Sequence, residues 1–391
     1  MYDLSGFPSQ FNYISYAQEV IFAPGALARL SEAIERFGWQ RLMLCTNHSM
    51  RVGGHAASIE AMLGDRLVAV FDQVHPHVQI DQVDQAVALA AQNDVDAIIG
   101  LGGGSPIGMA KAVAARLDEA TPGHSERFIS PTSQPAVPVI AIPTTYAGSE
   151  VTAVYGITDT HDTPPRKVTF SGPKIAPKLV IYDPGLTLDL PPEMTASTGI
   201  NALAHCIEAL YSIRRHPLST AAAISGVRHI HCALLRCYTH GDDLDARTEM
   251  LLGAHLAGLS LASVTMGLHH GLCHVLGGTA GVPHGIANSI ILPHAMRFNA
   301  DATAPQLLPA AEAMGISPNG HSPVEAIETA ANQVFDLVGQ MNLPQRLRDA
   351  GVREEDLPHL AQLGFQNRTV QNNPKPITDV AQLERLLRDA W

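Results

Sequence analysis

Two stretches of the chain carry residues whose types and spacing suit chemistry. "TGINALAHCIEALYS" (198–212) has helical periodicity, so Asn201 and His205, which are four positions apart, leave from the same face. Further along, "LHHGLCHVLGGTAGVPHG" carries His270, His274 and His284. Three imidazoles with a carboxylate would make a metal site, but the fourth group here is an amide. The two stretches therefore predict either a metal centre or a former metal site whose chemistry has changed.

The first half of the chain alternates short apolar runs with amphipathic stretches. Near-continuous apolar runs at 41–46, 66–71, 96–101, 137–142 and 178–183 are typical of strands buried in a parallel sheet. Residues 25–38 and 80–94 have apolar side chains at helical spacing. This alternation predicts a doubly wound α/β domain over residues 1–188.

The pattern changes after "YDPGLTLDLPPEM", and from there only helical periodicity is present. The double proline at 191–192 suits the entry to a helix. We expect an all-helical second domain over residues 189–391, with the boundary near 185–192.

Composition narrows the partners and the compartment. The chain has 391 residues and a formal net charge of −12, which disfavours nucleic acid and anionic membrane surfaces as partners. Its five cysteines lie mostly in apolar runs, as reduced thiols in the cytosol do. The N-terminal stretch lacks the pattern of a signal peptide, and no apolar run has the length of a membrane span. We therefore expect a cytoplasmic protein that acts on a small molecule.

Two loops of the first domain suit ligand binding. "DAIIGLGGGSPIGMAKAVAARL" runs from strand through a glycine turn to a helix, with Ser105 expected at the N-cap. Glycines let the backbone approach a ligand closely, and the free N–H groups of a helix start favour an anion. "AIPTTYAGSEVT" follows the next strand and supplies hydroxyls. Both loops follow the carboxyl ends of strands, where doubly wound sheets bind ligands.

Together these segments resemble the iron-containing alcohol dehydrogenase superfamily. The matching motifs are "GGGSPIGMAK", "IPTTYAGSEVT", "TGINALAHCIEALYS" and "HGLCHVLGG…PHGIANSIILPHAMRFN", and the likeness runs from "VIFAPGALARL" to the C-terminus. The resemblance implies an α/β domain that binds NAD(P), a helical domain, an active site in the cleft between them and a homodimer.

Within the superfamily, four features resemble maleylacetate reductases. They are Gly108, Asn201 in place of a metal-binding Asp, the double histidine at 269–270 and the tail "NNPKPIT…LLRDAW". These enzymes reduce the C=C bond of maleylacetate, an unsaturated dicarboxylate, to 3-oxoadipate with NADH or NADPH, late in the degradation of aromatic compounds through hydroxyquinols and chlorocatechols. Two features depart from the pattern: Gly271 replaces a lysine, and "PHGIANSI" is closer to the alcohol dehydrogenases. A metal-dependent alcohol dehydrogenase or aldehyde reductase is the alternative.

The resemblance also implies roles for individual residues. The positions that match the superfamily's metal ligands are Asn201, His205, His270 and His284. The ion they would bind is Fe²⁺ or Zn²⁺. Because Asn201 removes the one negative ligand, we favour catalysis without metal, in which these groups act on the substrate directly and His274 donates the proton. We expect His269 to pack or to support the site from behind.

The cofactor is expected to contact Gly103, Gly104, Ser105, Thr144, Thr145, Ser149, Lys167 and Asn47. A carboxylate at the position of Asn47 would favour NAD, so its absence makes mixed use of NADH and NADPH plausible. With Gly271 in place of lysine, His77, Arg166, Lys167 and the histidines remain as sources of charge for the substrate carboxylates.

Overall fold

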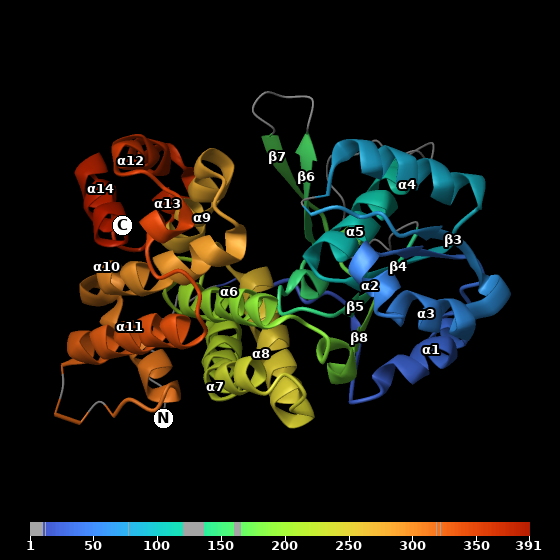
Figure 1. Cartoon of the computed structure of the whole chain (residues 1–391), viewed down its shortest axis with the longest axis horizontal. Helices are drawn as coiled ribbons and strands as arrows, with labels where there is room; N and C mark the ends of the chain where they lie inside the picture. Colours follow the sequence, from blue (N-terminus) through green and yellow to red (C-terminus); the bar gives the residue numbers. More distant parts are fainter. Residues whose placement is uncertain are drawn as a thin grey trace. The chain divides into compact units, whose positions relative to one another are not determined.

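A computed structural model of the chain describes residues 11, 13–76, 78–119, 137–159, 166–317, 319–320 and 322–391. The chain divides into two compact units, one from Ile14 to Leu190 and the other containing Pro191–Trp391. The first is an α/β unit with a parallel sheet and the second is helical, so the predicted fold class is confirmed (Figure 1).

The α/β unit is built on a six-stranded parallel sheet in the order β1-β8-β5-β4-β2-β3. Its strands are β1 (Glu19–Phe22), β2 (Leu42–Cys45), β3 (Leu67–Phe71), β4 (Ala97–Gly102), β5 (Val139–Pro143) and β8 (Leu179–Tyr182). Five of them confirm the predicted strands. The short edge strand β1 and the antiparallel hairpin of β6 (Val154–Asp159) and β7 (Arg166–Ser171) were not predicted.

Helices cover both faces of the sheet (Figure 1). They are α1 (Leu30–Phe37), α2 (His48–Val52), α3 (His55–Leu63), α4 (Ile80–Gln92) and α5 (Gly104–Glu119). Along β2, Leu42 and Leu44 join the core beneath α1 and α3, while Met43 and Cys45 join the core beneath α4 and α5. This alternation follows from the two-residue period of a strand, and burial on both faces explains the continuous apolar runs.

The topology creates a crevice at the carboxyl ends of β2 and β4. These two strands are hydrogen-bonded neighbours. The chain leaves β2 through α2 and α3 on one face and leaves β4 through α5 on the other. Neighbouring strands whose connections diverge in this way open a crevice in which doubly wound sheets bind ligands. The glycine turn follows β4, so the predicted binding loop lies at this crevice.

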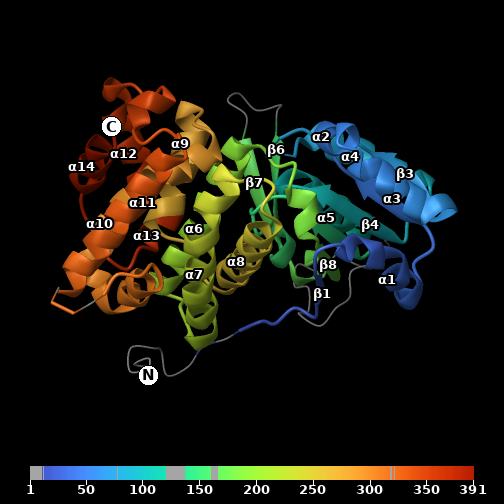
Figure 2. The same cartoon turned by 60° about the horizontal axis from the view of Figure 1, so that its bottom comes forward.

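The helical unit is organised around α6 (Pro192–Tyr211), which packs against α7, α8 and α10 (Figure 2). The other helices are α7 (Pro217–Thr239), α8 (Leu244–Ser263), α9 (Leu268–Ala280), α10 (His284–Ala313), α11 (Pro323–Gln340), α12 (Leu357–Gln366), α13 (Arg368–Gln371) and α14 (Val380–Asp389). Nearly every residue of α6 after its first turn is buried, as expected of a central helix.

Among the described residues, no single helix has the length and apolar character needed to cross a membrane. The bent pair of α8 and α9 meets that test only when the two helices are taken together.

Candidate functional site

The glycine turn after β4 depends on the absence of side chains. Gly102 has φ +134°, which L residues rarely adopt, and a Cβ there would lie 2.9 Å from Pro106 Cγ. The sequence predicted Ser105 at the N-cap of the following helix. Helix α5 in fact begins at Gly104, so Ser105 lies in its first turn. The difference is one residue, and the start of α5 still lies beside the turn.

The glycine turn packs against the threonine loop, so the structure brings these two predicted segments together. A Cβ on Gly103 would lie 3.1 Å from Thr145 Cγ2, and the Thr144 N–H donates to Gly102 O at 3.0 Å. Thr144 and Thr145 are themselves buried. The two loops thus form one backbone-lined surface, which fits the close approach of a dinucleotide phosphate.

Lys111 holds the far end of the threonine loop, and sequence reasoning missed it. Its Nζ, fully buried on α5, donates to the carbonyl oxygens of Ser149, Thr152 (2.7 Å) and Val154 (3.0 Å). Burial lowers the pKa of Lys111 to about 7, and the nearby Glu150 carboxyl opposes that effect. The only sequence signal was a lysine inside the apolar helix "GMAKAVAA".

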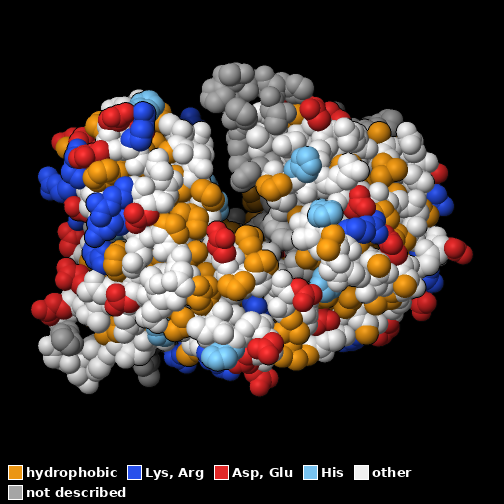
Figure 3. All heavy atoms as spheres, viewed as in Figure 1, with side chains coloured by type: hydrophobic (Ala, Val, Ile, Leu, Met, Phe, Trp, Pro, Cys, Tyr) orange, Lys and Arg blue, Asp and Glu red, His pale blue; other side chains and the backbone are white. Residues whose placement is uncertain are grey.

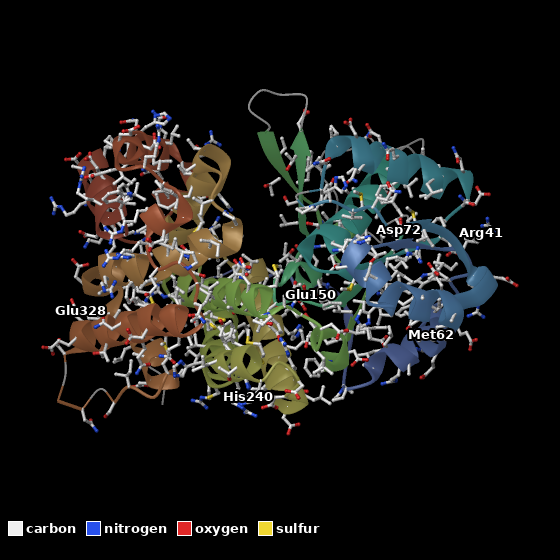
Figure 4. All side chains as sticks on the ribbon, in the orientation of Figure 1. Arg41, Met62, Asp72, Glu150, His240 and Glu328 are labelled. Atoms are coloured by element: carbon white, nitrogen blue, oxygen red, sulfur yellow. The ribbon has the colours of Figure 1, made fainter. Side chains whose placement is uncertain are left out.

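Glu150 balances this buried charge. Glu150, which is labelled in Figure 4, is 1% exposed. It accepts a hydrogen bond from Tyr182 Oη at 2.8 Å. Burial raises the pKa of Glu150. A buried lysine and a buried glutamate therefore fix the loop that carries Ser149.

Asn47 has a structural task beside the crevice. Its Oδ1 accepts from Met50 N at 3.2 Å and from Ser49 Oγ at 2.8 Å, which caps α2 and leaves the Nδ2 amide as the group able to reach a ribose.

A pocket of about 410 Å³ adjoins Asn47 and includes His48, Arg51 and Asp72 in its lining. Arg51 Nη2 pairs with Asp72 at 2.8 Å, and its Nη1 pairs with Glu60. Asp72 is labelled in Figure 4. Asp72 follows β3, the strand next to β2, so a carboxylate lies in the lining of this pocket although none follows β2 in the sequence.

Lys167 lies in β7, where its backbone pairs with Thr158. Its side chain, that of Arg166 and the whole of His77 lie outside the described residues.

Four of the predicted catalytic histidines come together in the helical unit. The rings of His205 and His270 are stacked with centroids 4.7 Å apart, and those of His274 and His284 are stacked at 5.9 Å. His270 lies 6.4 Å from His274 and 6.1 Å from His284. Helices α6, α9 and α10 each contribute. We call these four histidines, together with Asn201 one turn before His205 on α6, the histidine cluster.

Close helix packing positions this cluster. His284 is the first residue of α10, and a Cβ on the following Gly285 would lie 2.7 Å from Ser197 Cβ on α6. Ser197 lies one turn before Asn201. The start of α10 is therefore held directly against the helix that carries Asn201 and His205.

The histidine cluster contains buried polar atoms that lack hydrogen-bond partners among the described residues. They are Asn201 Oδ1, His205 Nδ1 and His270 Nε2. Burial lowers the pKa of His205 well below its ordinary value, with neighbouring His270 and His284 adding to the effect, and burial also lowers that of His270. Both imidazoles are therefore neutral near pH 7, and an unpaired buried polar atom costs about 1–3 kcal/mol. Such a site is suited to a ligand that pairs with these atoms.

A carboxylate that sequence reasoning missed lies behind the cluster. Glu208, His269 and His270 place possible ligand atoms within 4.8 Å of one another, and all three are buried. Glu208 already accepts hydrogen bonds from backbone N–H groups and from His270 Nδ1. Its lone pairs are thus used within the protein, and the group is a hydrogen-bond network. His269 belongs to it through Nδ1, 3.7 Å from Glu208, and through Nε2, 3.2 Å from Asn288 O.

Helix packing explains why glycine stands at position 271. A Cβ there would lie 2.7 Å from Val370 N, because α13 lies directly on α9 at this point. A lysine at position 271 would require α13 to move.

A second pocket, of about 480 Å³, includes Arg297, Lys375 and Arg385 in its lining. Figure 3 shows Lys and Arg side chains gathered on the helical unit, at the left of the view. None of the predicted site residues lines this pocket.

Comparison with known proteins agrees with this architecture. Residues 17–184 match the family model "Iron-containing alcohol dehydrogenase", and residues 195–391 match "Fe-containing alcohol dehydrogenase family, C-terminal". The maleylacetate reductase of Pseudomonas knackmussii is 36% identical over 95% of both chains. The lactaldehyde reductase of Escherichia coli K12 is 35% identical over 95% of this chain and 97% of its own.

Among solved structures, maleylacetate reductase from Agrobacterium tumefaciens has a TM-score of 0.84 and 32% identity, covering 98% of this chain and 99% of its own. The chain is an NAD(P)H-dependent oxidoreductase and belongs to the iron-containing alcohol dehydrogenase family.

Proposed function

We propose that the protein reduces the C=C bond of maleylacetate to give 3-oxoadipate. The observation that carries the proposal is the histidine cluster with Asn201 in place of a carboxylate. Its buried members Asn201, His205 and His270 have unpaired polar atoms that match an uncharged or delocalised oxygen of a substrate, while His274 and His284 are exposed. Curated maleylacetate reductases at about 35% identity over most of the chain support it.

The residues present suit this chemistry. When bound, NAD(P)H supplies a hydride to a double bond that is conjugated with a carbonyl group, and negative charge develops on the carbonyl oxygen as an enolate. The histidine cluster offers imidazole groups to such charge: His205 and His270 are buried, whereas His274 and His284 are exposed. His274, one turn after His270 on α9, donates the proton to the neighbouring carbon.

The α/β unit fits a dinucleotide at two points. Gly103 and Gly104 leave space where a Cβ would fill the turn, beside the start of α5. In the pocket next to Asn47, Asp72 suits a ribose hydroxyl and Arg51 suits a phosphate on that ribose. We therefore propose that both NADH and NADPH are accepted.

The donor types of the histidine cluster, with the unpaired buried atoms of Asn201, His205 and His270, also suit a divalent cation. Asn201, His205, His270 and His284 would hold Fe²⁺ or Zn²⁺ through nitrogen and oxygen donors, and the bound cation would supply a Lewis acid to a substrate oxygen. The second candidate function is accordingly a metal-dependent alcohol or aldehyde reductase, which the similarity to lactaldehyde reductase supports.

One experiment separates the two functions. Chelator-treated protein is mixed with NADH or NADPH and either maleylacetate or lactaldehyde, while the nicotinamide absorbance is followed. We expect turnover of maleylacetate that survives chelation. Rapid reduction of lactaldehyde that disappears on chelation and returns with Fe²⁺ or Zn²⁺, without reduction of maleylacetate, would establish the alternative.

A further inference from the structure

Glu208 joins two helices beneath the histidine cluster. It lies on α6, is fully buried, and reaches the first residues of α9. Its Oε1 accepts from Gly267 N at 3.0 Å and from His269 N at 3.1 Å. Its Oε2 accepts from His270 N at 3.2 Å. Helix α9 has no side-chain cap of its own, so Glu208 takes that role from another helix.

Gly267 lies against this carboxylate: a Cβ on it would be 3.4 Å from Glu208 Oε1, at the limit of ordinary van der Waals contact. Both oxygens of Glu208 accept backbone N–H groups, two at Oε1 and one at Oε2. These donors suit a carboxylate that acts as an acceptor at both oxygens.

The same carboxylate fixes the orientation of one catalytic imidazole. Oε2 contacts His270 Nδ1 in addition to the His270 backbone N–H. His269 Nδ1 also lies 3.2 Å from His270 Nδ1. Glu208 Oε2 is the nearer partner and accepts, so this contact places a proton on His270 Nδ1. The opposite nitrogen, Nε2, is buried and has no partner among the described residues.

We propose that Glu208 is a positioning residue that locks His270 with its proton on Nδ1, so that neutral His270 presents a lone pair on Nε2. His270 then accepts a hydrogen bond or binds a cation, and it does not donate to an oxyanion. Resting on the proposed function, this assigns the stabilisation of the enolate oxygen to the other members of the histidine cluster. A carboxylate behind a histidine is a common device for fixing which nitrogen faces a ligand.

Glu208→Gln tests this assignment because the two oxygens have different partners. Oε1 receives two backbone N–H groups and Oε2 receives one, from His270, so we expect the amide oxygen to take the place of Oε1. The amide N–H₂ then stands at Oε2 and donates to His270 Nδ1, which moves the ring proton to Nε2. Tyr211→Phe is the matched control, because Tyr211 Oη lies 3.4 Å from Oε1 and contributes nothing to Oε2.

The measurement is ¹⁵N NMR of histidine-labelled protein without substrate, with His270 assigned from the spectrum of His270→Gln. In the wild type and in Tyr211→Phe we expect a protonated Nδ1 and an unprotonated Nε2, and the reverse in Glu208→Gln. A wild-type ring with its proton on Nε2, or an unchanged tautomer in Glu208→Gln, would overturn the inference. If Glu208→Gln does not fold, the wild-type spectrum decides the tautomer, and Glu208→Asp, one methylene shorter, should show both tautomers.

Kinetics supply the second readout. With maleylacetate, Glu208→Gln should lower kcat roughly 10–100-fold while the dissociation constant of NADH stays unchanged. A rise in that constant with kcat intact would contradict a positioning role. If the wild type fails to reduce maleylacetate, the proposed function fails, while the NMR result stands independently.

Discussion

The glycine turn of the α/β unit and the histidine cluster of the helical unit prepare for their ligands in opposite ways. The turn is shaped by backbone: Gly102 adopts a φ that other residues avoid, and Gly103 and Gly104 have no side chain to occupy the surface. The histidine cluster is shaped by side chains, and three of its buried polar atoms lack partners among the described residues.

The two regions differ in how preparing the site lowers the stability of the folded protein. In the turn, the cost is the conformational entropy that glycine loses on folding, and the folded backbone itself is not strained. The histidine cluster instead buries polar atoms at the expense of stability, which a bound ligand restores. Substitutions in the first region should therefore act on cofactor affinity, and substitutions in the second should exchange turnover for stability.

The largest effect is expected from His274→Ala. Loss of the proton donor should lower kcat for maleylacetate by roughly 10²–10⁴-fold and leave the dissociation constant of NADH unchanged, because the cofactor is bound by the other unit. Stopped-flow absorbance and NADH fluorescence titration measure the two quantities. His294→Gln, a histidine on α10 outside the cluster, is the control. An unchanged kcat in His274→Ala would remove His274 from the mechanism.

Gly103→Val should act on the cofactor alone. Its side chain would meet Thr145, since even a Cβ lies only 3.1 Å from Thr145 Cγ2. We expect the dissociation constant of NADH to rise at least about tenfold, which corresponds to about 1.4 kcal/mol. Gly278→Ala is the control, because a Cβ on Gly278 meets nothing within 4 Å. Equal affinity in Gly103→Val and the wild type would mean that the turn does not contact the cofactor.

The smallest effect is expected from a substitution that tests whether the histidine cluster lowers the stability of the protein. Asn201→Leu replaces an amide with an unpaired buried Oδ1 by an apolar side chain of similar size. We expect the free energy of unfolding to rise by about 1 kcal/mol while turnover of maleylacetate falls. Urea denaturation and steady-state rates measure both. A variant that is less stable than the wild type would show that Asn201 is satisfied in the folded protein.

Features formed by residues that are adjacent in the sequence could be predicted, and features that depend on the folded chain could not. The glycine turn and the histidines were predictable because strand, turn and helix are adjacent in sequence and because imidazoles rarely cluster by chance. Lys111 and Glu208 were missed because a charged residue in a helix normally marks the solvent face, and only the fold reveals that both are buried. The reason for Gly271 was equally hidden, since Val370 lies far away in the chain.

The hairpin of β6 and β7 and the edge strand β1 were missed for a related reason. Val20 on β1, Val154 on β6 and Phe170 on β7 are exposed apolar residues. These short strands place apolar residues on exposed as well as buried positions. They therefore lack the continuous apolar run that identified the buried strands.

The central claim is that hydride reaches a carbon of a conjugated double bond and that a proton from the histidine cluster completes the reduction. NADH carrying deuterium at both C4 positions, reacted with maleylacetate and the chelator-treated protein, tests it most directly. NMR of the product should find deuterium on one carbon of the former double bond and hydrogen from solvent on the other. Deuterium on the hydroxyl-bearing carbon of an alcohol product, which was the carbonyl carbon of the substrate, would contradict the account.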